Sequence, residues 1–316
     1  MASTRPCSAV ALRPTMMPDA PESLDELETE SRHPNTVDLD LLSPHQLVRR
    51  LVDLQSDPAQ LAVREALAQV TAAVAAVISR LHRGGRLVYV GSGTSGRLLE
   101  ADAAELAPTF GFDPARLLVV RPNFGNGGPT AANEDAATEG EALAAHHRLG
   151  PNDAVVALAA SGRTPFTVAV AGAAMDRGSL TVGVAHNPGS PLAQRCELSV
   201  ELLTGPEPIA GSTRMVAGLA QKLFLTTLST AVMVGLGCTY SNLMTRTTSS
   251  ISKLGERRIR TLETIGGLER RVAAALLEEC DGNVEVAALL ALRGMTEAQA
   301  REALDRHGTL RRALEA

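Results

Sequence analysis

Buried strand patterns alternate with helix patterns along the middle of this chain. The strand patterns are mostly continuous apolar runs, at residues 86–90, 117–120, 154–159, 181–184 and 198–203. Helix patterns separate them, at residues 98–106, 131–147 and 164–176. Apolar strands that alternate with helices are typical of a parallel sheet covered by helices on both faces. The sequence therefore predicts an α/β fold around a five-stranded parallel sheet.

The segments on either side of this alternating region have other patterns. Residues 1–28 contain several prolines and then an acidic run, so we expect a disordered tail. A helix is predicted to start at Pro44, because Ser43 and Gln46 have the spacing of a capping box. A further Ala/Val-rich helical pattern covers residues 58–82.

The C-terminal third is predicted to be helical. No strand pattern follows Gly211, and a long apolar helix is expected before three short ones. The short helices are predicted at residues 268–279, 284–292 and 296–306. We therefore expect a small C-terminal helical subdomain over residues 266–316, following a main domain over residues 29–265.

Composition excludes several classes of function. The 316 residues carry a net charge of −5 and only 2% aromatic residues, which argues against a nucleic-acid partner. The four cysteines form no Cys-x-x-Cys pair and the histidines show no metal-ligand spacing, so we expect reduced thiols and no metal. No signal peptide is recognised, and the apolar stretch 223–237 is too short for a membrane span. A cytoplasmic protein without a membrane partner is predicted.

Two loops have the composition of a phosphate-binding site. Each follows a predicted strand and opens a predicted helix; residues 91–97 are Gly-Ser-Gly-Thr-Ser-Gly-Arg and residues 160–165 are Ala-Ser-Gly-Arg-Thr-Pro. Free N–H groups at a helix N-terminus attract anions, and Ser and Thr hydroxyls add donors. One such loop is often a plain turn, whereas a pair in one parallel sheet favours a phosphosugar site.

The first loop also matches Gly-x-Gly-x-x-Gly over residues 91–96, which is a weak signal for a dinucleotide site. Such a site requires an acidic residue at the end of the next strand, where this chain has Arg121. A third polar segment, residues 211–215, opens a helix that runs through Lys222. The three helix starts can converge at the carboxyl edge of the sheet, where open α/β folds bind ligands.

Two acidic residues are candidates for acid–base chemistry. Glu105 lies in an Ala-rich part of the helix after the first loop, and Glu134 follows the Gly-rich segment 126–130. By position alone, each is explained as an ordinary surface acid. Beside a phosphosugar, two carboxylates with different pKa values can divide acid and base work.

Several runs of residues carry a resemblance to a known family. They are residues 29–34, 85–97, 160–165, 187–190, 211–215, 220–222 and 304–308. Together they resemble the N-acetylmuramic acid 6-phosphate etherases of the sugar isomerase (SIS) superfamily, over about residues 29–316. The resemblance implies an SIS-type parallel five-stranded sheet flanked by helices in a phosphosugar-binding domain, residues 29–265.

The resemblance also implies an activity. The protein would be a homodimeric carbon–oxygen lyase of amino-sugar recycling that needs no cofactor. It would cleave the lactyl ether of N-acetylmuramic acid 6-phosphate by elimination and hydration, giving N-acetylglucosamine 6-phosphate and D-lactate. Glu105 matches the family's proton donor, and Glu134 matches its second catalytic glutamate, which we expect to be the base. The expected substrate-binding residues are Ser92, Thr94, Ser95, Ser161, Gly162, Thr164, Ser212 and Lys222, with Arg97 and Arg163 as further cations.

The chain departs from the family pattern in two places. The family usually has Ser before the first glutamate and Cys-Pro-Pro after it, whereas Ala104 precedes Glu105 here and Leu-Ala-Pro follows. The stretch between Gly128 and Glu134 is several residues shorter than in the family. Two other functions fit the same fold, namely a phosphosugar-sensing regulatory protein without catalysis and a phosphosugar isomerase. Both candidate glutamates favour an enzyme over a sensor, and the match through the helical tail favours an etherase over an isomerase.

Overall fold

The central sheet has five parallel strands in the order β2-β1-β3-β4-β5. The computed structural model describes residues 23, 27–122, 135–248 and 252–316. The strands of the sheet are β1 (Leu87–Gly91), β2 (Leu117–Val120), β3 (Ala154–Leu158), β4 (Leu180–Ala185) and β5 (Leu198–Glu201). The predicted fold class is confirmed, because each predicted strand is present and pairs in parallel with its neighbours.

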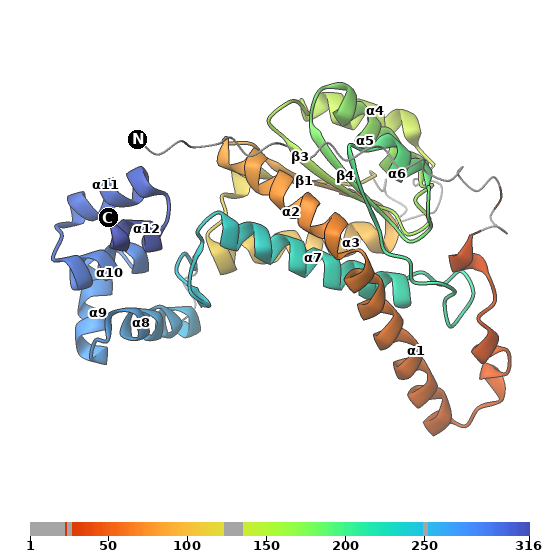
Figure 1. The fold of residues 1–316 in the computed structure, drawn as a ribbon, viewed down its shortest axis with the longest axis horizontal. Helices are drawn as coiled ribbons and strands as arrows, with labels where there is room; N and C mark the ends of the chain where they lie inside the picture. Colours follow the sequence, from red (N-terminus) through yellow and green to blue (C-terminus); the bar gives the residue numbers. More distant parts are fainter. Residues whose placement is uncertain (1–22, 24–26, 123–134, 249–251) are drawn as a thin grey trace, which may run out of the picture.

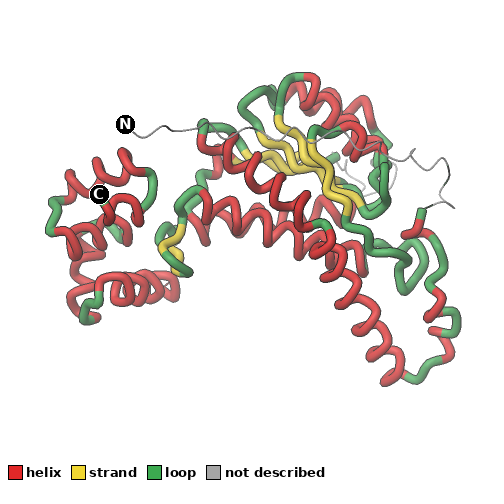
Figure 2. Tube along the Cα trace, viewed as in Figure 1, coloured by secondary structure: helices red, strands yellow, loops and turns green. Residues whose placement is uncertain are grey.

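Helices cover both faces of the sheet (Figure 1). One face carries α2 (Leu67–His82), α3 (Gly93–Phe110) and α7 (Val216–Gly235), with α1 (Pro44–Glu65) packed on α7 and extending beyond the sheet. The other face carries α4 (Ala137–His146), α5 (Pro165–Asp176) and α6 (Pro191–Arg195). Figure 2 shows the strands as one layer between these two layers of helices.

Strand side chains fill two separate hydrophobic cores. Leu87 and Tyr89 of β1 belong to the core on the α2–α3–α7 side, whereas Val88 and Val90 belong to the core on the α5 side. Successive side chains of a strand point to opposite faces, so a strand buried between two helical layers must be apolar at every position. All five residues of β1 and of β3 are buried, which explains their continuous apolar sequences.

The predicted start of α1 at Pro44 is confirmed. The backbone N–H of Ser43 donates to Gln46 Oε1 at 3.1 Å, as the capping-box spacing requires. The predicted helix over residues 58–82 is corrected to two helices, because the chain bends at Ala66 between α1 and α2. Pro58 lies inside α1 instead of starting a helix.

The C-terminal part contains a strand pair that the sequence analysis did not predict. Strands β6 (Thr239–Tyr240) and β7 (Leu243–Met244) form an antiparallel ribbon, so the expectation of no strand after Gly211 is wrong. Two-residue strands are too short to leave a periodic pattern in a sequence. They precede α8 (Ser252–Gly266), α9 (Arg270–Glu279), α10 (Val284–Arg293), α11 (Glu297–His307) and α12 (Leu310–Glu315). Two short helices were also not predicted, namely α12 and, earlier in the chain, α6.

Helices α8 to α12 have a hydrophobic core of their own, which includes Leu262, Leu277, Leu289 and Leu310. In Figure 1 they form a separate group of blue helices beside the sheet domain. At the other end of the chain, residues 1–22 and 24–26 of the predicted disordered tail lie outside the described residues. Leu27, the next residue, is 1% exposed and packs with the folded part.

Helix α7 is long and apolar enough to meet a simple criterion for a membrane span. In its most apolar window, 61% of the residues are buried inside the protein, and it contacts α1, α2 and α3. A core helix of a globular domain meets the same criterion, and burial on this scale identifies α7 as one.

Candidate functional site

The site lies between β1 and β3, the point from which the strand order β2-β1-β3-β4-β5 runs to opposite edges of the sheet. Strands β1 and β3 are neighbours, and their register pairs Gly91 with Leu158, so both strands end at the same level. The helices that follow them pack on opposite faces, since Leu99 of α3 belongs to one core and Phe166 of α5 to the other. The two loops therefore diverge and leave a crevice at the carboxyl ends of the strands, which is where open α/β folds bind ligands.

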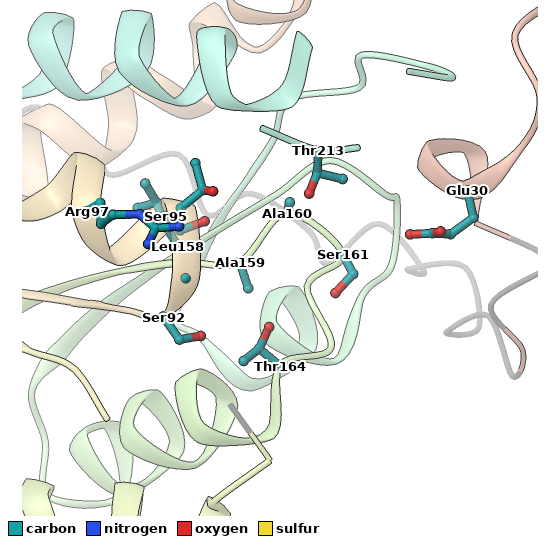
Figure 3. A pocket seen from close by; sticks show the side chains of 12 residues that line it. Glu30, Ser92, Ser95, Arg97, Leu158, Ala159, Ala160, Ser161, Thr164 and Thr213 are labelled. Atoms are coloured by element: carbon teal, nitrogen blue, oxygen red, sulfur yellow. The ribbon is translucent and has the colours of Figure 1, made fainter. Parts of the chain in front are cut away.

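A cavity of about 320 Å³ occupies this crevice. It is lined by Glu30, Ser92, Gly93, Thr94, Ser95, Arg97, Leu158, Ala159, Ala160, Ser161, Thr164 and Thr213. Side-chain hydroxyls dominate the lining, and Figure 3 shows the labelled ones, among them Ser92, Ser161, Thr164 and Thr213, distributed around it. The structure thus brings together five of the expected binding residues from both loops: Ser92, Thr94, Ser95, Ser161 and Thr164.

Two helix N-termini open at the cavity. No side chain of the described residues caps the first turn of α3 or of α5, so their free N–H groups remain available to a ligand. Each of these helices carries a partial positive charge at this end, which stabilises an anion. The cavity therefore combines hydroxyl donors with two helix dipoles, as a phosphate group requires.

The third predicted helix start is closed to a ligand. The buried carboxylate of Glu207 accepts hydrogen bonds from the backbone N–H groups of Val216 and Ala217, at 2.8 and 2.9 Å. Burial raises the pKa of Glu207, and the two hydrogen bonds oppose this shift. The expectation that α7 would offer its N-terminus to an anion is therefore wrong, because the protein supplies the anion itself.

Ser95 also links the cavity to the core. Its hydroxyl donates to Gln221 Oε1 of α7 at 3.0 Å, and both side chains are buried. A buried side-chain hydrogen bond between two helices fixes their relative position. Helix α7 thus positions the first loop through Gln221, although its own N-terminus takes no part in the cavity.

Three of the expected binding residues do not line the cavity. Gly162 lies in the second loop and packs against Ser190, since an added Cβ would be 2.3 Å from the side chain of Ser190. Ser212 is half-exposed beside the cavity residue Thr213. Lys222 lies instead near Asp102, whose pKa its positive charge lowers.

Asp102 forms a buried polar contact between the sheet, α3 and α7. It accepts hydrogen bonds from the Tyr89 hydroxyl at 2.8 Å and from the Ser229 hydroxyl at 3.1 Å. Burial raises the pKa of Asp102, against the opposing effects of these hydrogen bonds and of Lys222. The positive charge of Lys222 is thus one of the influences that lower the pKa of this buried carboxyl group.

Of the two expected catalytic glutamates, only Glu105 belongs to the described residues. Glu105 is exposed on α3 and does not line the cavity. Glu134 lies outside the described residues. Within the described ranges, no three His, Cys, Asp or Glu side chains gather as metal ligands.

Sequence reasoning missed two polar side chains that line the cavity, those of Thr213 and Glu30. Thr213 lies in the polar segment before α7, but it was not among the expected binding residues. Glu30 comes from the N-terminal segment and faces the cavity from the side opposite Arg97 (Figure 3). The only sequence signal for Glu30 is its place in the run 29–34, one of the runs that carry the family resemblance.

Comparisons with known proteins agree with the resemblance in the sequence. The SIS domain model matches residues 135–231. The N-acetylmuramic acid 6-phosphate etherase of Rubrobacter xylanophilus is 42% identical over 295 residues, which is 93% of this chain and 97% of that protein. The etherase of Deinococcus radiodurans is 42% identical over 290 residues, or 90% of this chain and 93% of the other. Among solved structures, the Vibrio vulnificus NanR protein complexed with ManNAc-6P is 16% identical, with a TM-score of 0.43, covering 60% of this chain and 65% of that one.

Proposed function

Because the chain belongs to the N-acetylmuramic acid 6-phosphate etherase family, we propose that it hydrolyses the lactyl ether of N-acetylmuramic acid 6-phosphate. The products are N-acetylglucosamine 6-phosphate and D-lactate, and the bond is broken by elimination followed by hydration, as in a carbon–oxygen lyase. The enzyme would act in the cytoplasm, in amino-sugar recycling from the cell wall.

One observation carries this proposal beyond the family relationship. The cavity gathers six hydroxyl side chains and two free helix N-termini from the ends of β1 and β3 and the loop before α7. Hydroxyl and backbone N–H donors bind phosphate oxygens without the bulk of several cations. A volume of about 320 Å³ accommodates a sugar phosphate at the lower end of the usual range for ligand pockets.

The proposed reaction needs one base and one acid. The open-chain sugar has an aldehyde at C1, which acidifies the proton on C2. Glu134 removes this proton, and the C3–O bond breaks as Glu105 protonates the departing lactate oxygen. Water then adds at C3 and a proton returns to C2, so the sum is substrate plus water giving the two products. Positive potential from helix N-termini stabilises the enolate.

The position of Glu105 leads us to propose that the homodimer shares its active sites. Glu105 follows Gly93, the first residue of α3, by twelve residues, which places it about 18 Å further along the helix axis. A sugar whose phosphate is held at the start of α3 does not reach that far. Because Glu105 is exposed, it is free to enter the cavity of a second subunit, and each cavity would receive its proton donor from the partner.

Lactate release tests the proposed activity. N-acetylmuramic acid 6-phosphate is incubated with the parent protein, Glu105→Gln and Glu134→Gln, and D-lactate is measured. We expect release by the parent and by neither variant. In water labelled with ¹⁸O, the label should appear on C3 of the product sugar, and label found only in lactate would contradict the elimination mechanism. Binding without turnover would point to a sensor, and an aldose–ketose conversion to an isomerase.

A mixing experiment tests the shared active sites. Glu105→Gln and Ser161→Asp, each inactive alone, are refolded together so that subunits exchange. If Glu105 acts on the partner's cavity, half of the random dimers contain one intact site, so about a quarter of the sites regain activity. If Glu105 acts within its own chain, no dimer contains an intact site and the mixture stays inactive.

A further inference from the structure

A single carboxylate, that of Glu30, lines the cavity among the described residues. Figure 3 shows its side chain entering from the N-terminal segment and pointing toward the side where Ser161 and Thr213 lie, with Arg97 at the far side. No donor in the described part of the chain forms a hydrogen bond or an ion pair with this carboxylate. The mechanism above gives it no role.

The protein holds Glu30 in place through its neighbour Thr29, which is fully buried. The backbone oxygen of Thr29 accepts from the Gly211 N–H at 3.0 Å, and its hydroxyl oxygen accepts from Asn187 Nδ2 at 3.2 Å. These contacts tie the N-terminal segment to two loops at the carboxyl edge of the sheet, one after β4 and one before α7. Glu30 is therefore a fixed part of the cavity wall, although it is far from the phosphate loops in sequence.

Gly211 further defines where the carboxylate lies. Its φ of +73° is in the left-handed region, and an added Cβ would be only 2.6 Å from Glu30 Oε2. The carboxylate thus packs directly against the backbone of this loop. A side chain at residue 211 would displace Glu30 and would also strain the backbone.

The charge of Glu30 restricts which part of a ligand it can contact. A carboxylate repels a phosphate group, most strongly in a confined site of low dielectric constant. An ionised carboxylate is also only an acceptor of hydrogen bonds. Its partner in the bound state must therefore be a neutral donor at the end of the ligand away from the phosphate. A hexose offers hydroxyl groups there, and an N-acetyl sugar also offers an amide N–H.

We propose that Glu30 recognises the sugar end of the substrate by accepting a hydrogen bond from a hydroxyl or amide N–H, while its charge excludes a second anionic group from that end. This assignment rests on the proposed function for the identity of the sugar. It also orients the substrate, because the anionic lactyl arm must point away from Glu30. The phosphate then lies toward the Arg97 side of the cavity, with the hydroxyl-rich loops around it.

Binding measurements on the full-length protein test the proposal. Calorimetry with N-acetylglucosamine 6-phosphate, and competition with inorganic phosphate, are run on the parent, Glu30→Ala, Glu30→Gln and Glu28→Gln. Glu28 is the matched control, since it is exposed in the same short helix and does not line the cavity. We expect Glu30→Ala to weaken sugar-phosphate binding about tenfold or more, as for loss of a charge-assisted hydrogen bond. Glu30→Gln, which keeps an acceptor oxygen, should lose less.

Inorganic phosphate separates recognition of the sugar from support of the loops. Its affinity should be unchanged or higher in both Glu30 variants, because the phosphate loops stay intact and a repulsive charge is gone. A parallel loss of phosphate and sugar-phosphate binding would overturn the proposal, since Glu30 would then only hold the wall in place. Unchanged sugar-phosphate binding in Glu30→Ala, or an equal effect of Glu28→Gln, would overturn it as well.

Kinetics with N-acetylmuramic acid 6-phosphate give an independent readout. A group that only recognises the sugar should raise KM in Glu30→Ala and leave the pH profile of kcat unchanged. Loss of the acid limb of that profile would make Glu30 a proton-transfer group and refute the assignment. The proposed function can fail separately. If the parent binds the sugar phosphate through Glu30 but releases no lactate, the proposed activity is wrong and the role of Glu30 stands. If lactate is released and KM does not depend on Glu30, the proposed activity stands and the role of Glu30 is wrong.

Discussion

Replacement of Gly162 by Ala should show how tightly the second phosphate loop is packed. Gly162 has a φ of +70°, and an added Cβ would lie 2.3 Å from Cβ and Oγ of Ser190 and 2.9 Å from Cβ of Ala185. These are short side chains attached to fixed backbone: Ser190 caps α6 by accepting from the Ala193 N–H, and Ala185 ends β4. Neither can rotate away, so the loop itself must move.

Gly84→Ala is the matched control for this change. Gly84 has a similar φ of +83°, but nothing lies within 4 Å of an added Cβ. Both variants lose about 1–2 kcal/mol from placing an L residue in the left-handed region. They share the smaller gain from a less flexible unfolded chain. Only Gly162→Ala adds an overpacking cost, typically about 1–3 kcal/mol, so its unfolding free energy should be lower than that of Gly84→Ala by about 2 kcal/mol.

Urea unfolding followed by circular dichroism measures this difference. With an unchanged slope of about 3 kcal/mol/M, the upper part of the usual range because the chain is long, the midpoint of Gly162→Ala should lie about 0.7 M below that of Gly84→Ala. Because the loop moves, Gly162→Ala should also weaken binding of inorganic phosphate, whereas Gly84→Ala should leave it unchanged. Equal midpoints for the two variants would refute the argument that Ser190 and Ala185 confine the loop.

Three further predictions follow from buried polar groups. Burial raises the pKa of Asp102 above its usual 3.8, so the folded state keeps this proton to higher pH than the unfolded chain, and the stability that the proton contributes is lost as the pH rises through the folded pKa. The urea midpoint of Asp102→Asn should therefore rise relative to that of the parent between acidic and neutral pH. A relative fall over the same range would contradict this. Burial raises the pKa of Cys196 to about 12, so peptide mapping after iodoacetamide at mildly alkaline pH should find this thiol unmodified in the folded protein and modified in urea. Glu285 accepts hydrogen bonds from the Thr245 hydroxyl at 2.7 Å and from Arg246 Nε at 3.0 Å. Glu285→Ala should therefore lower the unfolding free energy by about 2 kcal/mol. An unchanged midpoint in scanning calorimetry would show that these hydrogen bonds add nothing to stability.

Local patterns were sufficient to predict the sheet and the two loops that line the cavity. Continuous apolar runs such as residues 154–158 report burial on both faces, and this burial does not depend on which strands are neighbours. A loop of small residues between a strand and a helix, as at residues 91–97, likewise contains its own anion-binding groups. These features depend on residues close together in the sequence, so they could be recognised without the fold.

Other features depend on partners that are distant in the chain. Glu207 and Val216 look unrelated in the sequence, yet the carboxylate of Glu207 occupies the helix N-terminus that the sequence pattern offers to a ligand. Lys222 lies on the same helix, and only packing against α3 brings it near Asp102 instead of the cavity. A residue's charge and neighbours in the chain do not reveal which of several acceptors it will meet.

The layered α/β architecture, the family and the two loops that line the cavity could be recognised from the sequence, because periodicity and short motifs encode burial and backbone geometry locally. The positions of Glu207 at the start of α7 and of Glu30 in the cavity wall, in contrast, follow from the fold of the whole chain. Each of these depends on how the order β2-β1-β3-β4-β5 brings distant segments to one edge of the sheet, and that order is set by packing of the whole chain.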